Sequence, residues 1–199
     1  MPRDTALPVT PTAPGKIVVE QLDGDQALAV VDALTDVLID CVEGGASVSF
    51  MLPLTRERAT AFWRKVAASV GRGERVLLVA RHKAPRARGA PGAQDDGAIV
   101  GTVQLVLDLP ENQPHRADVA KMLVHRSARR QGVAAQLMAA LDDVARAFDR
   151  HVLVLDTVTG GDAERLYQRS GWQRAGDVPK FALMPDGGFC ATTFYYKHL

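Results

Sequence analysis

The residues with the clearest chemical pattern lie between positions 116 and 134. An apolar run ends near His125, a short basic turn follows, and Gly132 begins a strongly periodic segment that extends to about Phe148. This order predicts a strand, a turn and the N-terminus of a helix. The exposed N–H groups at a helix N-terminus carry partial positive charge and bind anions. The turn is therefore a candidate anion site.

The side chains of this turn strengthen the anion-site hypothesis. Arg129, Arg130 and Gln131 add hydrogen-bond donors and two full positive charges at the start of the helix. The small residues Gly132 and Ala134 let a ligand approach the backbone closely. A pyrophosphate would be bound well in this setting. A solvated Arg-Arg turn before an ordinary helix explains the turn, taken alone, equally well.

Three further residues could do acid–base chemistry. Tyr167 lies on a short helical segment, and Asp118 and Asp156 are carboxylates in strands that otherwise look buried. Asp156 lies at the carboxyl end of its strand, where the ligands of parallel sheets gather. Either carboxylate could instead cap a turn or pair with a neighbouring cation, Arg116 or Lys121.

Several common chemistries are excluded by missing motifs. The sequence has no nucleotide P-loop, no G-x-G-x-x-G after a strand and no G-x-S-x-G nucleophile elbow. Its five histidines have no zinc-like spacing with one another or with cysteine, so we expect no metal site. Cys41 lies on the apolar side of a predicted helix, where burial would make its thiol inert.

Composition places the chain among ordinary globular proteins. Of its 199 residues, 47% are hydrophobic and 24% are charged, and the net charge of +1 gives no reason to expect binding to nucleic acid or to an anionic membrane. Two cysteines are too few for a disulfide framework, and no stretch is long and apolar enough to span a membrane. We therefore expect a cytoplasmic protein with no membrane partner.

The pattern of apolar residues predicts the elements that hold these groups. Residues 1–15 contain four prolines and are expected to be a disordered lead-in, so a single domain would span residues 16–199. Helices are predicted at 25–41, from 55, at 132–148 and at 163–170, the last with Asp162 as its N-cap. Strands are predicted at 16–22, 75–82, 98–108, 117–124, 151–157, 173–178 and 190–197, with a long hairpin loop at 83–97. The segment from 117 to 157 is expected to form a right-handed βαβ unit with parallel strands.

Two motifs together resemble those of the GNAT N-acetyltransferase superfamily. They are Arg129-x-x-Gly132-x-Ala134 after a strand and Leu166-Tyr167-x-x-x-Gly171-Trp172 on a later short helix. The resemblance covers residues 16–199. It implies an α/β fold with a mixed, mostly antiparallel central sheet, a splayed parallel strand pair at the centre, and flanking helices. Within the superfamily, the segments that look most like the tabtoxin resistance protein branch are 44–51, 121–124, 155–157 and 185–187.

The resemblance implies acetyl-CoA as co-substrate. Its pyrophosphate would lie on the turn before the helix, and its pantetheine arm would pair with the backbone of the central strand like an added β-strand. Val124 is six residues from Asp118, roughly 20 Å at ~3.3 Å per residue, so the thioester would lie toward Asp118. The implied cofactor-binding residues are Met122, Leu123, Val124, Arg129, Arg130, Gln131, Gly132, Val133 and Ala134.

The resemblance also implies catalytic roles. An attacking amine must be neutral, so a general base is useful. Asp156 stands where the tabtoxin resistance branch has an aspartate, and Asp118 stands where many GNAT members carry a glutamate base; we favour Asp156. Tyr167 matches the family's general acid for the departing thiolate. Gly160 replaces an asparagine with which many members hold pantetheine, so that side-chain contact is not carried over.

The acceptor would be bound by the first helices, the loop between them and the last strands. We expect Glu43, Ser47, Ser49 and Phe50 to contact it. The prediction is an acetyl-CoA-dependent N-acetyltransferase that acts on a small amine, such as a toxin, an antibiotic or an amino-acid-like compound, by direct attack in a ternary complex. Alternatives are acetylation of a protein N-terminus or lysine, and a non-catalytic acyl-CoA-binding module. A homodimer through the last strands is compatible with the resemblance.

Overall fold

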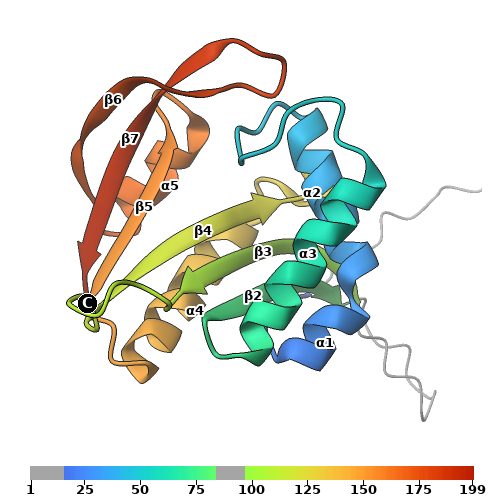
Figure 1. The fold of residues 1–199 in the computed structure, drawn as a ribbon, viewed down its shortest axis with the longest axis horizontal. Helices are drawn as coiled ribbons and strands as arrows, with labels where there is room; N and C mark the ends of the chain where they lie inside the picture. Colours follow the sequence, from blue (N-terminus) through green and yellow to red (C-terminus); the bar gives the residue numbers. More distant parts are fainter. Residues whose placement is uncertain (1–15, 84–96) are drawn as a thin grey trace, which may run out of the picture.

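A computed structural model describes residues 16–83 and 97–199 of the chain. The expected lead-in at 1–15 and almost all of the expected hairpin loop at 83–97 lie outside this part. The strands of the described chain form one seven-stranded sheet in the order β1-β2-β3-β4-β5-β7-β6 (Figure 1). They are β1 (Lys16–Leu22), β2 (Arg75–Lys83), β3 (Ala98–Val106), β4 (Arg116–Val124), β5 (Val152–Val158), β6 (Gln173–Leu183) and β7 (Phe189–His198).

The strand directions confirm the expected mixed sheet. Among the described strands, β4 and β5 are the parallel neighbours, and every other neighbouring pair is antiparallel. Helix α4 (Val133–Ala147) connects β4 to β5, as predicted for the βαβ unit. The parallel pair lies near the middle of the sheet, so the fold class expected from the sequence is confirmed.

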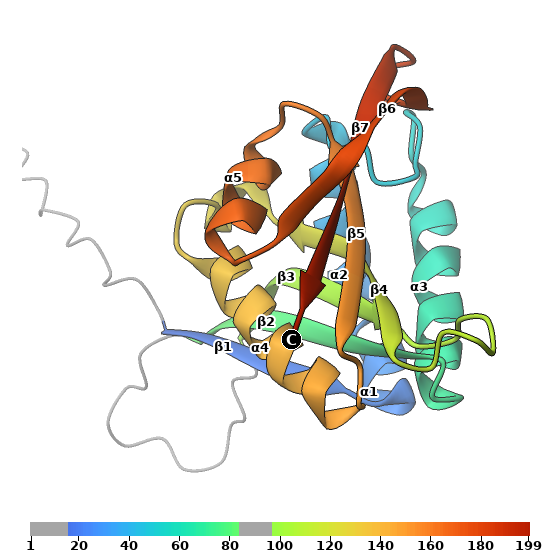
Figure 2. The same cartoon turned by 90° about the vertical axis from the view of Figure 1, so that its left-hand side faces the viewer.

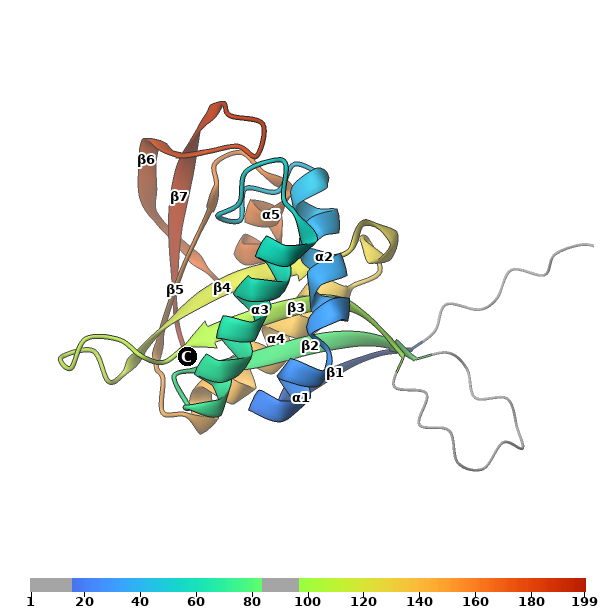
Figure 3. The same cartoon turned by 45° about the vertical axis from the view of Figure 1, so that its right-hand side comes forward.

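Helices cover both faces of the sheet. Helices α1 (Gly24–Ala29), α2 (Val31–Glu43) and α3 (Arg56–Gly71) lie on one face, and α4 lies on the other (Figure 2, Figure 3). Helix α5 (Asp162–Arg169) follows β5 and packs its Tyr167 against Tyr195 of β7. Two buried clusters result, one between the sheet and α4 and the other among α1, α2, α3 and the sheet. Each helix is thus fixed by one apolar face.

The predicted first helix is divided in two. Helix α1 begins at a capping box in which the Asp23 side chain accepts from the Gln26 N–H, and it ends at Val30, whose backbone (φ −108°, ψ 15°) is not helical. Helix α2 begins at the next residue. The break changes the face that is buried: Ala27 is fully buried, whereas Leu28, one of the periodic apolar positions, is 53% exposed. A single continuous helical period was therefore the wrong interpretation of this segment.

Two boundaries near the C-terminus also differ from the prediction. Gly161 rather than Asp162 is the N-cap of α5, and Asp162 instead forms an ion pair with Arg165 one turn along the helix. Strand β6 extends past Pro179 to Leu183 through a register shift at which Lys180 has a left-handed backbone (φ +54°). An edge strand tolerates a proline, because the proline's missing N–H would face away from the partner strand.

Strands β4 and β5 separate soon after they pair. They share three register pairs, which end at Asp118 and Val154. Beyond this point β4 contains a bulge, since two residues lie between its pairs with Thr102 and Gln104 of β3. Lys121, in the bulge, has a left-handed backbone with φ +50°. A bulge increases the local twist of a strand, which turns the rest of β4 away from β5.

The packing of α4 on β3 gives a stability test. A Cβ atom on Gly101 would lie 3.0 Å from the Leu123 carbonyl oxygen and 3.0 Å from a Val133 methyl group. We expect Gly101→Ala to lower the free energy of unfolding by about 1–3 kcal/mol, because the buried contact would be overpacked. Gly176→Ala is the matched control, since a Cβ at that position on β6 would meet nothing within 4 Å. Denaturant unfolding of both variants checks this, and equal stabilities would refute it.

Candidate active site

A cavity of about 770 Å³ lies where β4 and β5 diverge. Its walls come from the loop at 44–51, from β4 at 119–122, from β5 at 155–158, and from α5 and the end of β6. In Figure 1 the two strands separate beneath the loop that leads from α2 to α3 and the turn between β6 and β7. The volume is within the range of small-molecule sites, about 300–1,000 Å³. The carboxyl end of the parallel pair is thus hollow, as the topology favours.

The two candidate bases have different surroundings. Asp156 of β5 lines the cavity, whereas Asp118 of β4 is not among the lining residues and forms an ion pair with Arg116. Partial burial raises the pKa of Asp156, and the nearby Asp118 charge raises it further, against an opposing effect of Lys121. Asp118 therefore pairs with a neighbouring cation, which was the alternative considered for both carboxylates. Asp156 is the carboxylate that faces open space.

Tyr167 reaches the same cavity from α5. The residue is 5% exposed, and its ring packs against those of Trp172 and Tyr195, with centroid distances of 6.0 and 5.8 Å. Burial raises the pKa of the Tyr167 hydroxyl to about 12, and the charge of Asp156 contributes in the same direction. The aromatic packing fixes the ring, and the hydroxyl stays protonated at neutral pH. Tyr167 is therefore a rigid hydrogen-bond donor beside a carboxylate.

The turn before α4 offers unpaired backbone donors. Gly132 is the N-cap of α4 with a left-handed backbone (φ +80°), and Arg130 also has a positive φ of 62°. A positive φ is uncommon for a residue with a side chain, such as Arg130, and it often marks a functional turn. Among the described residues, no side chain caps α4, and its first turn carries no acidic residue. The N–H groups at this helix start thus remain available to an anion.

Arg129 connects this turn to the cavity. Its side chain lines the cavity, and its Nε donates to the Val124 carbonyl oxygen over 3.4 Å. The Gln131 side chain is turned back instead, with its amide donating to the Ser127 carbonyl oxygen over 3.0 Å. A Cβ atom on Gly132 would meet only the end of Gln136, at 3.9 Å. Open space therefore adjoins the donors, which suits a ligand with an anionic group.

Asp40 of α2 holds the start of the turn. Its carboxylate accepts from the Arg126 backbone N–H over 2.7 Å and from the Arg126 Nε over 2.8 Å, and His125 Nε2 lies 3.4 Å away. Burial alone would raise the pKa of Asp40, but the two hydrogen bonds from Arg126 lower it below its ordinary value of 3.8. The basic turn is therefore tied to the helix layer on the opposite side of β4.

The 44–51 loop forms one wall of the cavity and is held to the last strands. The Ser47 hydroxyl donates to the Leu183 carbonyl oxygen over 3.0 Å, and the Leu52 N–H donates to the Pro185 carbonyl oxygen over 2.9 Å. Phe50 lines the cavity and packs edge-to-face on Phe62 of α3, with centroids 5.3 Å apart. Two segments far apart in sequence therefore join in one wall of the cavity between β4 and β5.

Lys121 is a charged residue of the cavity to which the sequence analysis assigned no functional role. Its Nζ donates to the Ser49 hydroxyl over 3.0 Å and lies 5.9 Å from the centroid of the Phe62 ring. Burial lowers the pKa of Lys121, and the charge of Asp156 opposes this shift. The bulge in β4 directs Lys121 into the cavity. The apolar pattern of the sequence does not reveal this bulge.

Some predicted site residues lie elsewhere. Glu43 is exposed at the end of α2, where its carboxylate is 3.8 Å from the Arg126 guanidinium, and it does not line the cavity. Leu123 is buried in the sheet and pairs with Thr102 of β3. Cys41 is buried as expected, and burial raises the pKa of its thiol. The structure thus brings together Asp156, Tyr167, Met122, Arg129, Ser47, Ser49 and Phe50.

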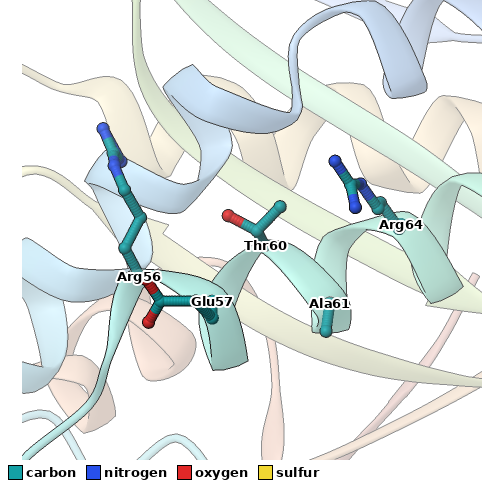
Figure 4. A pocket seen from close by; sticks show the side chains of 5 residues that line it. All are labelled: Arg56, Glu57, Thr60, Ala61 and Arg64. Carbon is teal, nitrogen blue, oxygen red and sulfur yellow. The ribbon is translucent and has the colours of Figure 1, made fainter.

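A smaller depression of about 310 Å³ lies on the surface of α3 (Figure 4). Its walls come from this single helix, through Arg56, Glu57, Thr60, Ala61 and Arg64. Arg56 is engaged by Asp36 of α2 through hydrogen bonds of 2.7 and 2.8 Å. With one exposed helix as its wall, this depression has no convergent set of groups, and we assign it no chemistry.

Comparison with known proteins identifies the family. The model of the acetyltransferase (GNAT) family matches residues 54–172. The chain belongs to the GNAT acetyltransferase family. An uncharacterised N-acetyltransferase in the hisH-hisA intergenic region of Azospirillum brasilense is 31% identical over 142 residues, which cover 70% of this chain and 74% of that protein.

Solved GNAT structures share the fold. A GCN5-related N-acetyltransferase from Kribbella flavida is 21% identical with a TM-score of 0.70, over 92% of this chain and 98% of that one. A putative acetyltransferase from Salmonella typhimurium, solved with its cofactor acetyl-CoA, is 17% identical with a TM-score of 0.69, over 92% of this chain and 94% of that one. At these identities the likeness concerns the fold alone.

The family confirms the enzyme class expected from the two motifs. The chain is an N-acetyltransferase with acetyl-CoA as its donor. In residues 16–83 and 97–199 we find no helix long and apolar enough to cross a membrane, and no group of three or more side chains that could hold a metal ion.

The link between Asp40 and Arg126 predicts a pH-dependent stability. Because the pKa of Asp40 is lowered in the folded state, its contribution to the free energy of unfolding is present above about pH 4 and is lost as the pH falls through the folded value. We expect Asp40→Asn to destabilise the protein by about 1–3 kcal/mol at pH 7 and by progressively less below pH 4. Denaturant unfolding at several pH values tests this. Asp36→Asn, at an exposed ion pair, is the control, and a pH-independent loss at Asp40 would contradict the prediction.

Proposed function

We propose that this chain acetylates the amine of a small molecule by direct attack in a ternary complex with acetyl-CoA. One observation carries the proposal. Asp156 from β5, Tyr167 from α5 and Arg129 from the turn before α4 all line the same cavity. A base, a proton donor and one end of an anion site therefore border a single space, which is what acetyl transfer from acetyl-CoA to an amine requires.

The turn before α4 fits the pyrophosphate of acetyl-CoA. When bound, acetyl-CoA supplies an acetyl group activated as a thioester. The backbone N–H groups of residues 132–134 and the side chains of Arg129 and Arg130 would hold the pyrophosphate oxygens. Gln131 would contribute its backbone, because its side chain is engaged with Ser127. The lack of a competing carboxylate in the first turn of α4 supports this assignment.

The open side of β4 fits the pantetheine arm. Beyond Asp118, β4 has no register pair with β5, so backbone groups on this side can pair with an extended ligand. Neighbouring residues of a strand direct their backbone groups to opposite sides. Since the His125 N–H donates to the Val100 carbonyl oxygen of β3, His125 and Leu123 direct their backbone groups toward β3. Met122 and Val124 would then supply the contacts. This narrows the set expected from the sequence, in which Leu123 was included.

Asp156 is assigned as the general base. A lysine-like ammonium with a pKa of about 10.4 loses its proton at pH 7 at a cost of roughly 4–5 kcal/mol, so a carboxylate that accepts the proton during attack is useful. The raised pKa of Asp156 makes it a stronger base than an ordinary carboxylate. Asp118 would act indirectly, since it is paired with Arg116 and raises the pKa of Asp156 through its charge.

Tyr167 is assigned as the donor to the departing thiolate. A hydroxyl with a pKa of about 12 is a weaker acid than a thiol, whose pKa is about 8.5. Complete proton transfer from Tyr167 to the sulfur would therefore be uphill by several kcal/mol. Tyr167 would instead stabilise the developing negative charge through a hydrogen bond, and its rigid packing would aim that bond.

The volume of the cavity favours a small acceptor over a protein. The 44–51 loop is hydrogen-bonded to β6, the adjoining Leu52 is hydrogen-bonded to the turn after β6, and the loop forms one wall of the cavity of about 770 Å³ that Asp156 lines. A protein N-terminus or lysine would call for an open groove. A toxin, an antibiotic or an amino-acid-like compound remains the predicted acceptor, in keeping with the resemblance to the tabtoxin resistance branch. The single domain, the cytoplasmic location and the homodimer likewise stay predictions.

The pyrophosphate assignment is tested by acetyl-CoA binding. We expect Arg129→Ala combined with Arg130→Ala to weaken binding at least about tenfold, because two charge-assisted contacts are removed. Isothermal titration calorimetry measures the affinity, with Arg64→Ala on α3 as a control outside the cavity. An affinity unchanged by the double substitution would place the pyrophosphate elsewhere. Absence of acetyl-CoA binding to the wild type would overturn the whole proposal.

The catalytic assignment is tested by turnover. Asp156→Asn and Tyr167→Phe should each lower kcat by about 10²–10⁴-fold while leaving acetyl-CoA affinity nearly intact. Since Asp156 accepts a proton only when ionised, wild-type kcat/KM should fall as the pH drops through a value above the ordinary aspartate pKa of 3.8. Asp118→Asn should shift this fall in kcat/KM to lower pH, and it should lower kcat less than Asp156→Asn does. Turnover is measured as thiol release from acetyl-CoA with a library of amines. Unchanged turnover in Asp156→Asn or in Tyr167→Phe would reject the catalytic role of the substituted residue.

A further inference from the structure

Lys121 places a positive charge at the acceptor end of the cavity. The β4 bulge at this residue directs the side chain toward the 44–51 loop, where the Ser49 hydroxyl accepts from its Nζ at 3.0 Å. The ring of Phe62 lies beneath the ammonium at 5.9 Å. A hydroxyl and an aromatic face thus hold the charge in position, and neither of them neutralises it.

The charge of Lys121 has no counter-ion within the described chain. None of the ion pairs formed by residues 16–83 and 97–199 includes Lys121 or Asp156, although the two charges influence each other's ionisation. Partial burial of a charge that forms no ion pair is unfavourable. Such a group in a binding cavity is therefore suited to a ligand that brings the opposite charge.

The other charged residues of the cavity wall are already engaged. Arg129 lies at the turn before α4, with its Nε on the Val124 carbonyl oxygen, and in the proposed function it serves the pyrophosphate. Asp162 forms an ion pair with Arg165 on α5. Lys121 and Asp156 remain, one cation and one anion at the acceptor end. If the ammonium of the acceptor approaches Asp156, the positive charge of Lys121 still has no anionic partner.

We propose that the acceptor carries a carboxylate close to its amine, and that Lys121 and Ser49 bind this carboxylate while the amine faces Asp156. The inference rests on the proposed function and specifies its substrate class as an amino acid or an amino-acid-like compound. A zwitterion of this kind offers each of the two charges its opposite. The rest of the acceptor would contact an apolar wall, which consists of Phe50, Met51, Phe181, Leu183 and Met184.

The experiment compares free amino acids with their α-amides. Each α-amide keeps the amine and the side chain but replaces the carboxylate by a neutral carboxamide. Thiol release from acetyl-CoA is measured for the wild type over the twenty L-amino acids and the matching amides. We expect a preference for acids over amides of at least about tenfold, since a hydrogen bond between two charged groups is stronger than one to a neutral carboxamide.

Variants of Lys121 test whether this residue causes the preference for acids over amides. Lys121→Met should raise KM and lower kcat/KM for the acids by about 10- to 100-fold while changing the amides less than about threefold. Lys121→Arg should keep the preference for acids. Lys65→Met removes a lysine from the exposed surface of α3, outside the cavity, and should change neither class of acceptor.

Three results would overturn the inference. The first is that the wild-type enzyme acetylates other amines but no free amino acid, or that it acetylates acids and amides equally well. This test needs no variant, so it does not depend on whether a variant folds. The second is an equal loss for acids and amides in Lys121→Met, with a lower kcat and a shifted pH profile, which would make Lys121 a positioning residue for Asp156. The third is an absence of thiol release with every amine, which would refute the proposed function as well.

Discussion

The separation of β5 from β4 after Asp118 is the constraint on which the site depends. The two strands pair over three residues, after which β4 stays with β3 and β5 continues along β7. Backbone groups inside a protein require partners, so the open side of β4 is a surface prepared for an extended ligand. The same separation creates the cavity and exposes Asp156 to it. The proposed cofactor path and the proposed catalytic base thus follow from one feature of the sheet.

Similar residues acquire different roles from their surroundings. Asp118 and Asp156 lie close enough for their charges to interact, yet the first is paired with Arg116 and the second faces the cavity. Their environments therefore separate a supporting carboxylate from the one proposed to accept a proton. The hydroxyl of Tyr167 is held protonated by burial, so the site pairs a strengthened base with a weak acid. In the proposed mechanism Asp156 accepts the proton of the amine, and Tyr167 donates a hydrogen bond to the departing sulfur.

The sequence predicted the elements better than the details that set the site. Continuous apolar runs revealed the strands, and the amphipathic period revealed α4, whose N-cap at Gly132 was also expected. The break at Val30 was missed because Leu28 continues the apolar period although it lies on the surface. The position of Lys121 in the cavity could not be foreseen, because a bulge with a left-handed residue has no apolar signature. The position of Glu43 outside the cavity wall could not be foreseen either, because its neighbour Arg126 lies on a turn 83 residues later in the chain.

Hydrogen–deuterium exchange with and without acetyl-CoA tests the central claim most directly. If acetyl-CoA binds along the open side of β4 and on the turn before α4, amide exchange should slow in peptides that cover residues 119–124 and 129–135. Exchange in β1 and in the exposed edge strand β6 should stay unchanged. Saturating acetyl-CoA that leaves both covered segments unaffected, or that protects β6 instead, would contradict the account.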